Sequence, residues 1–234
     1  MRGGFVGVGG WQQNSFIDYP GTVAAVLFFS GCNLRCPYCH NPALARGESP
    51  ERVDPEQIRA FLRSRRGLIE GVVLSGGEPT IQESLAATVA EVRDLGYRIK
   101  LDTNGLLPDA IESVAPDYLA LDIKTRPSLY ASLLRAPYPD TPARLERSVA
   151  LARAMGGRAE VRVTAAPGCI DDGAVEEIAR LGSGVRRVFL QPMAQRYPLL
   201  DPAYDTIALP SREDLARYRE ILGRTVGECR IRGQ

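Results

Sequence analysis

The sequence has very little histidine and lysine, and it has no long apolar run. Among its 234 residues there is one histidine, His40, and there are two lysines, Lys100 and Lys124. The chain therefore has no Ser–His or His–carboxylate arrangement of the kind that general acid–base catalysis uses. No stretch approaches the roughly 18 apolar residues that cross a bilayer, so no membrane-spanning helix is expected.

Net charge is also nearly absent. The chain carries 29 basic and 28 acidic residues, which gives a net charge of +1. This balance gives no electrostatic reason to expect a nucleic-acid or membrane partner. Hydrophobic residues make up 44% of the chain and charged residues 24%, as in an ordinary soluble globular protein.

Cysteine is scarce and unevenly spread. Three of the five cysteines fall within eight residues, whereas a secreted disulfide framework would distribute an even number along the chain. The N-terminal stretch MRGGFVGVGGWQQNSF is too rich in glycine, and its apolar part is too short, for a signal peptide. These features predict a cytoplasmic protein in a reducing compartment.

Apolar strands alternate with amphipathic helices along most of the chain. We predict strands over 22–30, 71–75, 98–102, 117–123, 160–164 and 185–190. We predict helices over 56–66, 84–96, 107–114, 143–156, 174–182 and 212–223. Six such units indicate parallel strands with right-handed crossovers, and six are too few for the eight that close a standard barrel. The predicted fold is α/β, a partial (β/α)6 TIM-like barrel, with a doubly wound sheet as the alternative.

The chain is predicted to form a single domain, 1–234. Residues 1–21 form a glycine-rich N-terminal extension, 22–191 the core, and 192–234 a C-terminal segment with one helix. The unusual residues follow the predicted strands: Cys32, 76–79, 103–105, Lys124, 167–169 and 191–192. Because the carboxyl ends of parallel strands face the same side, we expect these segments to converge on one active-site mouth.

Three cysteines form the most specific motif, CNLRCPYC. Cys32, Cys36 and Cys39 have the spacing C-x3-C-x2-C, and three thiolates can hold three corners of an iron–sulfur cube. The fourth iron then has no protein ligand and can bind a substrate. Tyr38 would place an aromatic face at the edge of the cluster. The alternative is a Cys3His zinc site, but Cys39 and the adjacent His40 would reach one tetrahedral ion poorly.

Two glycines open the second predicted helix. Gly76 and Gly77, in SGGEPT, allow the backbone to approach a ligand closely and to turn out its carbonyls and amides. The alternative is a simple turn between a strand and a helix.

The motifs CNLRCPYC and GGEP together resemble those of the radical S-adenosylmethionine superfamily. The longer pattern GWQQNSFIDYPGTVAAVLFFSGCNLRCPYCHNP resembles the anaerobic ribonucleotide reductase activating proteins, which are related to pyruvate formate-lyase activating enzyme. The resemblance covers most of the chain, from about residue 10 to residue 191.

The resemblance implies a radical enzyme with two cofactors. Cys32, Cys36 and Cys39 would ligate a [4Fe–4S] cluster, and the amino and carboxylate groups of S-adenosylmethionine would chelate its open iron. The backbone oxygens that receive the amino group would belong to Gly76, Gly77, Glu78 and Pro79.

Three charged residues complete the implied cofactor site. Asp102, in LDTNG, would accept a hydrogen bond from the methionyl ammonium. Asp122 and Lys124, in DIK, match the two residues that the family uses to bind the ribose and the carboxylate of S-adenosylmethionine. The resemblance also allows a monovalent cation near Asp102 and Asp122. A zwitterion needs acceptors at one end and a cation at the other, which this set provides.

The implied activity is reductive cleavage of S-adenosylmethionine to methionine and a 5′-deoxyadenosyl radical. The radical would install a glycyl radical on a class III, anaerobic ribonucleotide reductase, with a flavodoxin or ferredoxin as electron donor. The alternatives are another glycyl-radical enzyme as substrate, a small-molecule reaction similar to carboxydeazaguanine synthesis, and a zinc-binding interaction module.

Several residues keep open roles. Related activases place a histidine at the last strand, but His40 is the only one here, so Gln191, Met193 or Gln195 would line that side. His40 would lie near the cluster or the substrate, or would cap its loop. Cys169 and Cys229 are expected to be inert, and no second cysteine cluster indicates an auxiliary centre.

Overall fold

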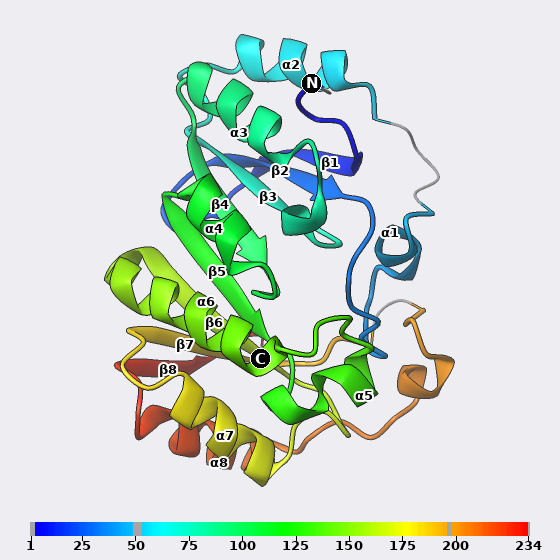
Figure 1. Ribbon diagram of the computed structural model, residues 1–234, viewed down its shortest axis with the longest axis vertical. Coiled ribbons are helices and arrows are strands. Elements are labelled where there is room, and N and C mark those ends of the chain that lie inside the picture. The colour runs from blue at the N-terminus through cyan, green and yellow to red at the C-terminus, as the bar shows by residue number, and fades with distance from the viewer. Residues whose placement is uncertain (1–2, 49–52, 196–197, 234) are drawn as a thin grey trace. The chain divides into compact units, whose positions relative to one another are not determined.

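The computed structural model describes residues 3–48, 53–195 and 198–233 (Figure 1). The chain divides into two compact units. Unit 1 comprises Met1–Asn33, Ala43–Thr103 and Asp109–Tyr118, and unit 2 comprises Leu34–Pro42, Asn104–Pro108 and Leu119–Gln234. The predicted single domain, 1–234, stays a prediction. Its end residues 1, 2 and 234 lie outside the described residues.

The described residues of unit 1 form four strands. They are β1 (Val8–Ser15), β2 (Ala24–Phe29), β3 (Gly71–Gly76) and β4 (Arg98–Thr103). β1 runs antiparallel to β2, whereas β2, β3 and β4 are parallel. β2 reads AAVLFF and has five of its six residues buried, as expected for a parallel strand covered on both faces. Phe29 pairs with Gly76, so the loops that follow β2 and β3 begin side by side.

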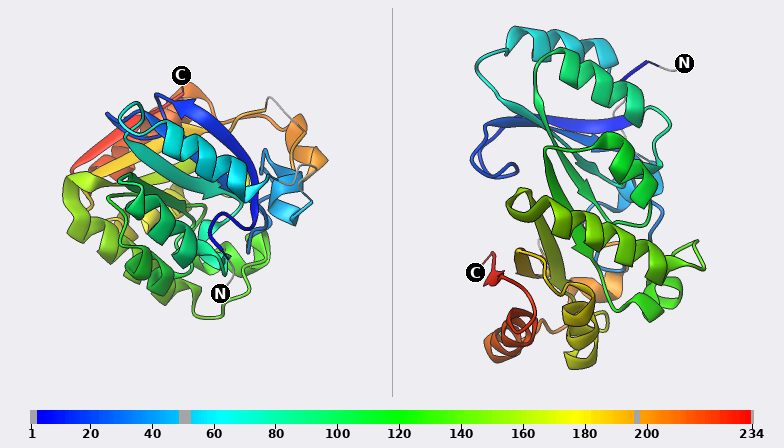
Figure 2. Two further views of the ribbon diagram at one scale, coloured as in Figure 1. Left: turned by 90° about the horizontal axis from the view of Figure 1, so that it is seen from above. Right: turned by 60° about the vertical axis from the view of Figure 1, so that its left-hand side comes forward.

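The helices of unit 1 lie between and after its strands along the chain. They are α1 (Pro42–Arg46), α2 (Pro55–Ser64), α3 (Leu85–Asp94) and α4 (Pro108–Val114), of which α1 and α4 begin at the border with unit 2. α2 and α3 lie side by side (Figure 2), joined by an ion pair of 2.7 Å between Arg59 and Glu91. Ile58 and Leu62 form the buried stripe of α2, which is the amphipathic pattern that predicts a surface helix.

Unit 2 has strands and helices in the same alternation. Its strands are β5 (Tyr118–Ile123), β6 (Ala159–Ala165), β7 (Arg187–Pro192) and β8 (Glu228–Ile231), and β5 begins one residue before the border. The pairs β5–β6, β6–β7 and β7–β8 are all parallel. Its helices are α5 (Tyr130–Leu134), α6 (Thr141–Met155), α7 (Asp172–Leu181) and α8 (Arg212–Gly223). An ion pair of 2.9 Å between Arg217 and Asp172 joins α8 to α7.

The predicted α/β class and the six βα units are confirmed. Every predicted strand and helix is present, and each end lies within two residues of its prediction. Among the described residues, two strands (β1 and β8) and two α-helices (α1 and α5) were not predicted. β1 has two glycines and four consecutive polar residues (QQNS), so its sequence lacks the apolar alternation of a strand. The segment predicted as a glycine-rich N-terminal extension, residues 1–21, thus contains a strand that pairs with β2.

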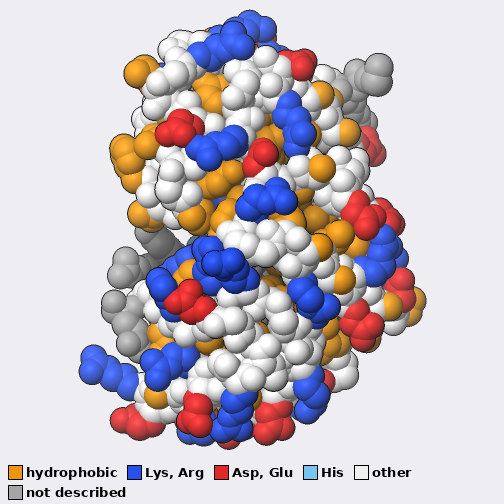
Figure 3. Space-filling model, turned by 90° about the vertical axis from the view of Figure 1, so that its left-hand side faces the viewer, with side chains coloured by type: hydrophobic (Ala, Val, Ile, Leu, Met, Phe, Trp, Pro, Cys, Tyr) orange, Lys and Arg blue, Asp and Glu red, His pale blue; other side chains and the backbone are white. Residues whose placement is uncertain are grey.

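The surface agrees with the balanced composition. Lys and Arg side chains are interspersed with Asp and Glu side chains on the face that Figure 3 shows. Among the described residues, no helix is long and apolar enough to cross a membrane.

The helix cap at α2 allows a test of this local structure. Asp54 is the N-cap, and its side chain accepts a hydrogen bond of 2.9 Å from the Glu56 amide. We expect Asp54→Ala to lower the free energy of unfolding by about 1 kcal/mol, measured by urea denaturation. The control is Asp54→Asn, because the amide oxygen of asparagine can accept the same cap bond. An equal loss in both variants would contradict the capping role.

Candidate functional site

The cysteine loop starts in unit 1. The Gly31 amide donates a hydrogen bond of 2.7 Å to the Leu44 carbonyl, and the Cys32 amide donates one of 3.0 Å to the Ala45 carbonyl. Cys32 is half-buried, and its Sγ lies 3.9 Å from Asn33 Oδ1. The short helix α1, which sequence reasoning missed, thus holds the start of the loop.

The other two cysteines of the motif belong to unit 2. The Cys39 amide donates a hydrogen bond of 3.0 Å to the Cys36 carbonyl, which closes a turn between the two cysteines. The Arg35 amide donates to the Leu134 carbonyl at 2.8 Å and ties this turn to α5. Both thiols are half-buried, and all five cysteines of the chain are without a disulfide. Within the described ranges, no set of three or more His, Cys, Asp and Glu side chains forms a preformed metal site.

A segment after β7 supports the same turn; we call residues 198–205 the strap. Its backbone runs against the cysteine loop, since the Leu200 amide donates to the Cys39 carbonyl and the Asp201 amide to the Pro37 carbonyl, each at 3.0 Å. The Tyr204 hydroxyl donates to the Pro167 carbonyl at 2.9 Å. Sequence reasoning assigned this segment no role, and its only signal was the Asp-Pro pair that caps a short 3-10 helix.

The glycine loop after β3 is held against the start of the cysteine loop. The Gly77 amide donates to the Phe29 carbonyl at 2.8 Å, and the Glu78 amide donates to the Gly31 carbonyl at 2.9 Å. A Cβ at Gly77 would lie 2.1 Å from the Gly31 carbonyl oxygen. Gly76 has φ of +113°, which glycine alone adopts readily. The two glycines are therefore required by the close packing of this loop on the protein's own backbone, and their contact with a ligand stays a prediction.

The Glu78 side chain stabilises this loop from inside. It is 1% exposed, and Oε1 accepts hydrogen bonds from the Thr80 amide at 3.1 Å, the Thr80 hydroxyl at 2.5 Å and the Thr103 hydroxyl at 2.7 Å. These bonds offset the cost of burying the carboxylate. The predicted ligand role of Glu78 rests on its backbone oxygen alone.

Asp102 lies at the end of β4 beside a buried lysine. Lys100 Nζ and Asp102 Oδ1 form a close ion pair, with side chains only 2% and 12% exposed. The Ser75 hydroxyl donates to Asp102 Oδ2 at 3.3 Å. The predicted ammonium acceptor therefore already has a positive partner from its own strand, a contact that was not foreseen.

In unit 2, Asp122 lies between two cations. Arg162 on β6 contacts both carboxylate oxygens, at 2.7 and 3.1 Å, and Lys124 Nζ lies 3.1 Å from Oδ2. Burial raises the pKa of Asp122, but Arg162 and Lys124 outweigh it and hold this pKa well below its usual range. Burial lowers the pKa of Lys124, and Asp122 together with Cys36 reverses this, so its pKa is raised. Arg162 was missed, although a charged residue within the apolar strand EVRVT was a signal.

Two buried tyrosines fix the backbone of Lys124. Its amide donates to the Tyr130 hydroxyl at 2.9 Å, and the Tyr38 hydroxyl donates to its carbonyl at 3.4 Å. Burial, followed by the nearby Cys36, raises the pKa of Tyr38 well above its usual value, so the phenol stays protonated. Tyr38 is thus a link between the cysteine turn and Lys124, and its predicted cofactor-binding role at the edge of the cluster stays a prediction.

His40 follows this turn on the surface. Neighbouring protein atoms that displace water lower its pKa, Lys124 lowers it further, and Asp122 opposes them. The ring is therefore neutral at pH 7, since the pKa of free histidine is already about 6.5.

The remaining candidate residues have different environments. Gln195 donates to the carbonyls of Tyr204 and Ile207, at 3.1 and 2.8 Å, and so supports the strap. Met193 is buried and Gln191 is half-buried, and their predicted role in lining the ligand site at the last strand stays a prediction.

Burial raises the pKa of Cys169, and burial raises that of Cys229 to about 11. Thiols with a raised pKa are poor nucleophiles at neutral pH, and the expectation that both cysteines are inert stays a prediction.

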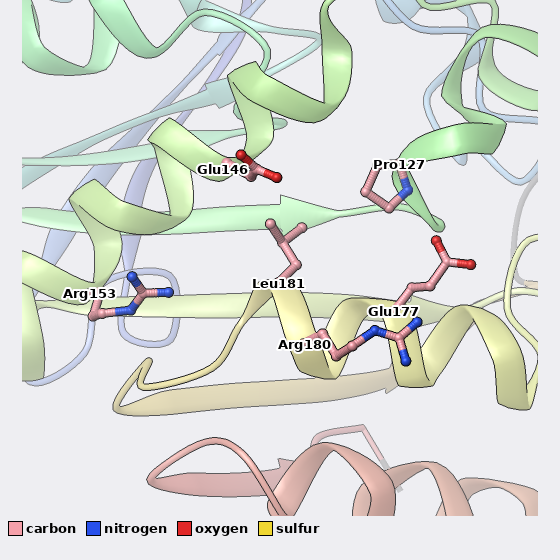
Figure 4. Close-up of a pocket in the computed structure, with 6 residues that line it drawn as sticks. All are labelled: Pro127, Glu146, Arg153, Glu177, Arg180 and Leu181. Atoms are coloured by element: carbon pink, nitrogen blue, oxygen red, sulfur yellow. The ribbon is translucent and has the colours of Figure 1, made fainter.

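A pocket of about 530 Å³ lies elsewhere in unit 2 (Figure 4). It is lined by Pro127, Glu146, Arg153, Glu177, Arg180 and Leu181. Most of these residues come from α6 and α7, and their charges are mixed. None of them was predicted as a site residue, so this pocket is not the candidate site.

Comparisons with known proteins agree with these motifs. Residues 26–182 match the model of the Radical SAM superfamily. The chain is 29% identical over 238 residues to a protein of Methanocaldococcus jannaschii named as a glycyl-radical enzyme activating enzyme, covering 96% of this chain and 95% of that protein. It is 34% identical over 119 residues to the 7-carboxy-7-deazaguanine synthase of Thermococcus kodakarensis, covering 41% of this chain and 47% of that enzyme.

A solved structure shares the fold. SuiB of Streptococcus suis, bound to the precursor peptide SuiA, matches with a TM-score of 0.63 and 18% identity over 89% of this chain and 48% of SuiB. This chain thus spans about half the length of SuiB. The likeness concerns the fold alone and, with the family match, confirms the predicted partial barrel.

The close approach at Gly77 predicts a large effect of one methyl group. We expect Gly77→Ala to lower the free energy of unfolding by about 3 kcal/mol, because the Gly31 carbonyl oxygen has to move. Gly10→Ala is the control, since a Cβ there meets nothing within 4 Å, and it should change the free energy by less than about 0.5 kcal/mol. Urea denaturation measures both. Similar values for the two variants would show that the glycine loop tolerates a side chain.

The depressed pKa of Asp122 predicts a pH-dependent stability. The contribution of Asp122 to the free energy of unfolding is fully present when the pH is above its pKa in the unfolded chain, which is about 3.9. This contribution is lost as the pH falls toward the lower pKa that Asp122 has in the folded protein. Asp122→Asn should therefore be less stable than wild type at pH 7, and the difference should shrink between pH 5 and pH 3. Urea denaturation at each pH checks this, and a constant difference would contradict the ion cluster.

Proposed function

Because the chain belongs to the Radical SAM superfamily, we propose that it is a glycyl-radical enzyme activating enzyme that acts on an anaerobic ribonucleotide reductase. The observation that carries the activase part of this proposal is the similarity along 96% of the chain to a relative whose name says glycyl-radical enzyme activating enzyme and specifies no reductase. The N-terminal pattern from residue 10 through the cysteine motif supports the reductase as the partner. A flavodoxin or ferredoxin in the cytoplasm would supply the electron.

The chain offers a donor set that suits an iron–sulfur cluster. Thiolates are the ligands that such clusters use, and Cys32, Cys36 and Cys39 are close enough in sequence to reach one cluster. The donor chemistry therefore fits, with the thiols half-buried on a loop that α1, α5 and the strap hold at several backbone positions.

The same loops would bind S-adenosylmethionine by its amino-acid end. Gly76 and Gly77 let their loop pack closely against the backbone of Phe29 and Gly31, and the carbonyls of the 76–79 segment with Asp102 would accept hydrogen bonds from the ammonium. Lys124 with Arg162 would receive the carboxylate, since their cluster with Asp122 has a net charge of +1. Asp122 would also hold the ribose.

When bound, the two cofactors supply the one-electron chemistry that cleaves S-adenosylmethionine. The chain's own residues would orient it and keep water away, and no side chain has to move a proton in this step. The neutral, surface-exposed ring of His40 suits a position beside the incoming polypeptide.

The direct test is formation of the glycyl radical. The anaerobically reconstituted protein is mixed with S-adenosylmethionine, a reductant and a class III ribonucleotide reductase. We expect the doublet of a glycyl radical by electron paramagnetic resonance, its loss in Cys36→Ala, and its retention in Cys229→Ala. Cleavage of S-adenosylmethionine without a doublet would contradict the reductase as partner.

A second function is favoured by the partial similarity to 7-carboxy-7-deazaguanine synthase. That match covers less than half of this chain, so we place it second. Formation of 7-carboxy-7-deazaguanine by the reconstituted protein, detected by mass spectrometry, would favour the synthase over the activase.

Analysis of bound iron and sulfide tests the alternative of a zinc-binding module, which predicts one zinc per chain and no sulfide.

A further inference from the structure

Tyr204 anchors the strap to the loop that follows β6. Its hydroxyl donates a hydrogen bond of 2.9 Å to the Pro167 carbonyl, and a Cβ at Gly168 would lie 3.3 Å from the hydroxyl oxygen. Burial, followed by the nearby Cys169 thiol, raises the pKa of Tyr204 to about 12, so at pH 7 the hydroxyl keeps its proton and remains a donor. The proposed mechanism gives this anchor no role.

The strap carries the anchor to the cysteine turn. Within the strap, the Tyr204 amide donates to the Asp201 carbonyl at 3.0 Å, and the Leu199 amide donates to the Asp205 side chain at 2.8 Å. The Leu199 side chain is buried. Residues 200–201 lie inside this closed segment, and their amides are the two that bond to the cysteine turn.

The other side of the cysteine turn is tied to the same loop after β6. The Tyr38 hydroxyl donates to the Lys124 carbonyl at 3.4 Å. The next residue, Thr125, is fully buried, and its hydroxyl donates to the Cys169 carbonyl at 2.6 Å. Cys169 lies two residues after Pro167, which accepts the hydroxyl of the strap. The hydrogen bonds therefore close a ring.

The ring joins four segments of unit 2: the cysteine turn, residues 124–125, the loop 167–169 and the strap. A closed network of hydrogen bonds restricts its members more than the same contacts would separately, because no segment has a loose end. Lys124 is itself a member of the ring. The ring therefore holds the backbone of the cysteine turn in a fixed position relative to the backbone of Lys124.

We propose that Tyr204 is a positioning residue, which closes this ring and so fixes the cysteine turn relative to Lys124. The identity of the two ligands, a cluster at the cysteine turn and a carboxylate at Lys124, rests on the proposed function. Tyr204 acts on both through the backbone of the ring. Because the chain's own groups make the ring, the site is ordered before a ligand binds, which lowers the cost of binding.

The first experiment measures hydrogen exchange in the reduced protein without cofactors. Tyr204→Phe removes one hydroxyl from the ring. Tyr138→Phe is the matched control, because the Tyr138 ring packs on Arg144 and its hydroxyl is not part of the ring. We expect the amides of residues 200–201 to exchange about tenfold faster in Y204F, the effect of one lost hydrogen bond, and at the wild-type rate in Y138F. Wild-type exchange in Y204F would overturn the proposal.

The second experiment cuts the ring at its other buried hydroxyl. Thr125→Val removes the bond to the Cys169 carbonyl, which belongs to the loop after β6 and not to the strap. We expect T125V to speed exchange at residues 200–201 as well. Because either cut opens the same ring, the double variant Y204F/T125V should stay within about twofold of the faster single variant. Wild-type exchange in T125V, or rates that multiply in the double variant, would overturn the ring.

The third experiment measures the affinity of the reconstituted protein for S-adenosylmethionine by anaerobic calorimetry. We expect Y204F to bind about fivefold more weakly at an unchanged iron content, since its site is less ordered, and Y138F to match wild type. A merely structural role would reduce the amount of loaded protein and leave the affinity of the loaded fraction unchanged, which would overturn the proposal. Absence of binding in wild type would instead overturn the proposed function, and hydrogen exchange would still decide the role of Tyr204.

Discussion

The close contact between the glycine loop and the start of the cysteine loop is the constraint on which the site in unit 1 depends. The amides of Gly77 and Glu78 bond to carbonyls at the end of β2, and this leaves no room for a Cβ at Gly77. The buried carboxylate of Glu78 then fixes the loop through Thr80 and Thr103. The result is a glycine loop whose backbone is fixed against the residues that lead into Cys32.

Charge compensation is the second organising principle. Each aspartate of the candidate site has its cation in its own unit: Lys100 for Asp102, and Arg162 with Lys124 for Asp122. The first pair is neutral and the second cluster is positive. For the proposed function, the positive cluster of unit 2 suits the carboxylate of the ligand.

Much of the fold could be predicted from the sequence, because its central strands are apolar runs separated by capped helices. β1 could not, since its polar and glycine-rich sequence becomes a strand only by pairing with β2. The strap was missed because its contacts with the cysteine loop are made by backbone amides, which leave no pattern in the side chains. Arg162 and Lys100 are visible as charges within apolar strands, but the sequence does not tell which carboxylate each one pairs with.

The central claim is that three cysteines hold a cluster whose open iron binds the amino-acid end of S-adenosylmethionine. Electron–nuclear double resonance tests it most directly, on the reduced protein with S-adenosylmethionine labelled with ¹⁵N in its amino group. The account predicts a hyperfine coupling between that nitrogen and the cluster. A protein that binds the labelled molecule but shows no coupling would contradict it.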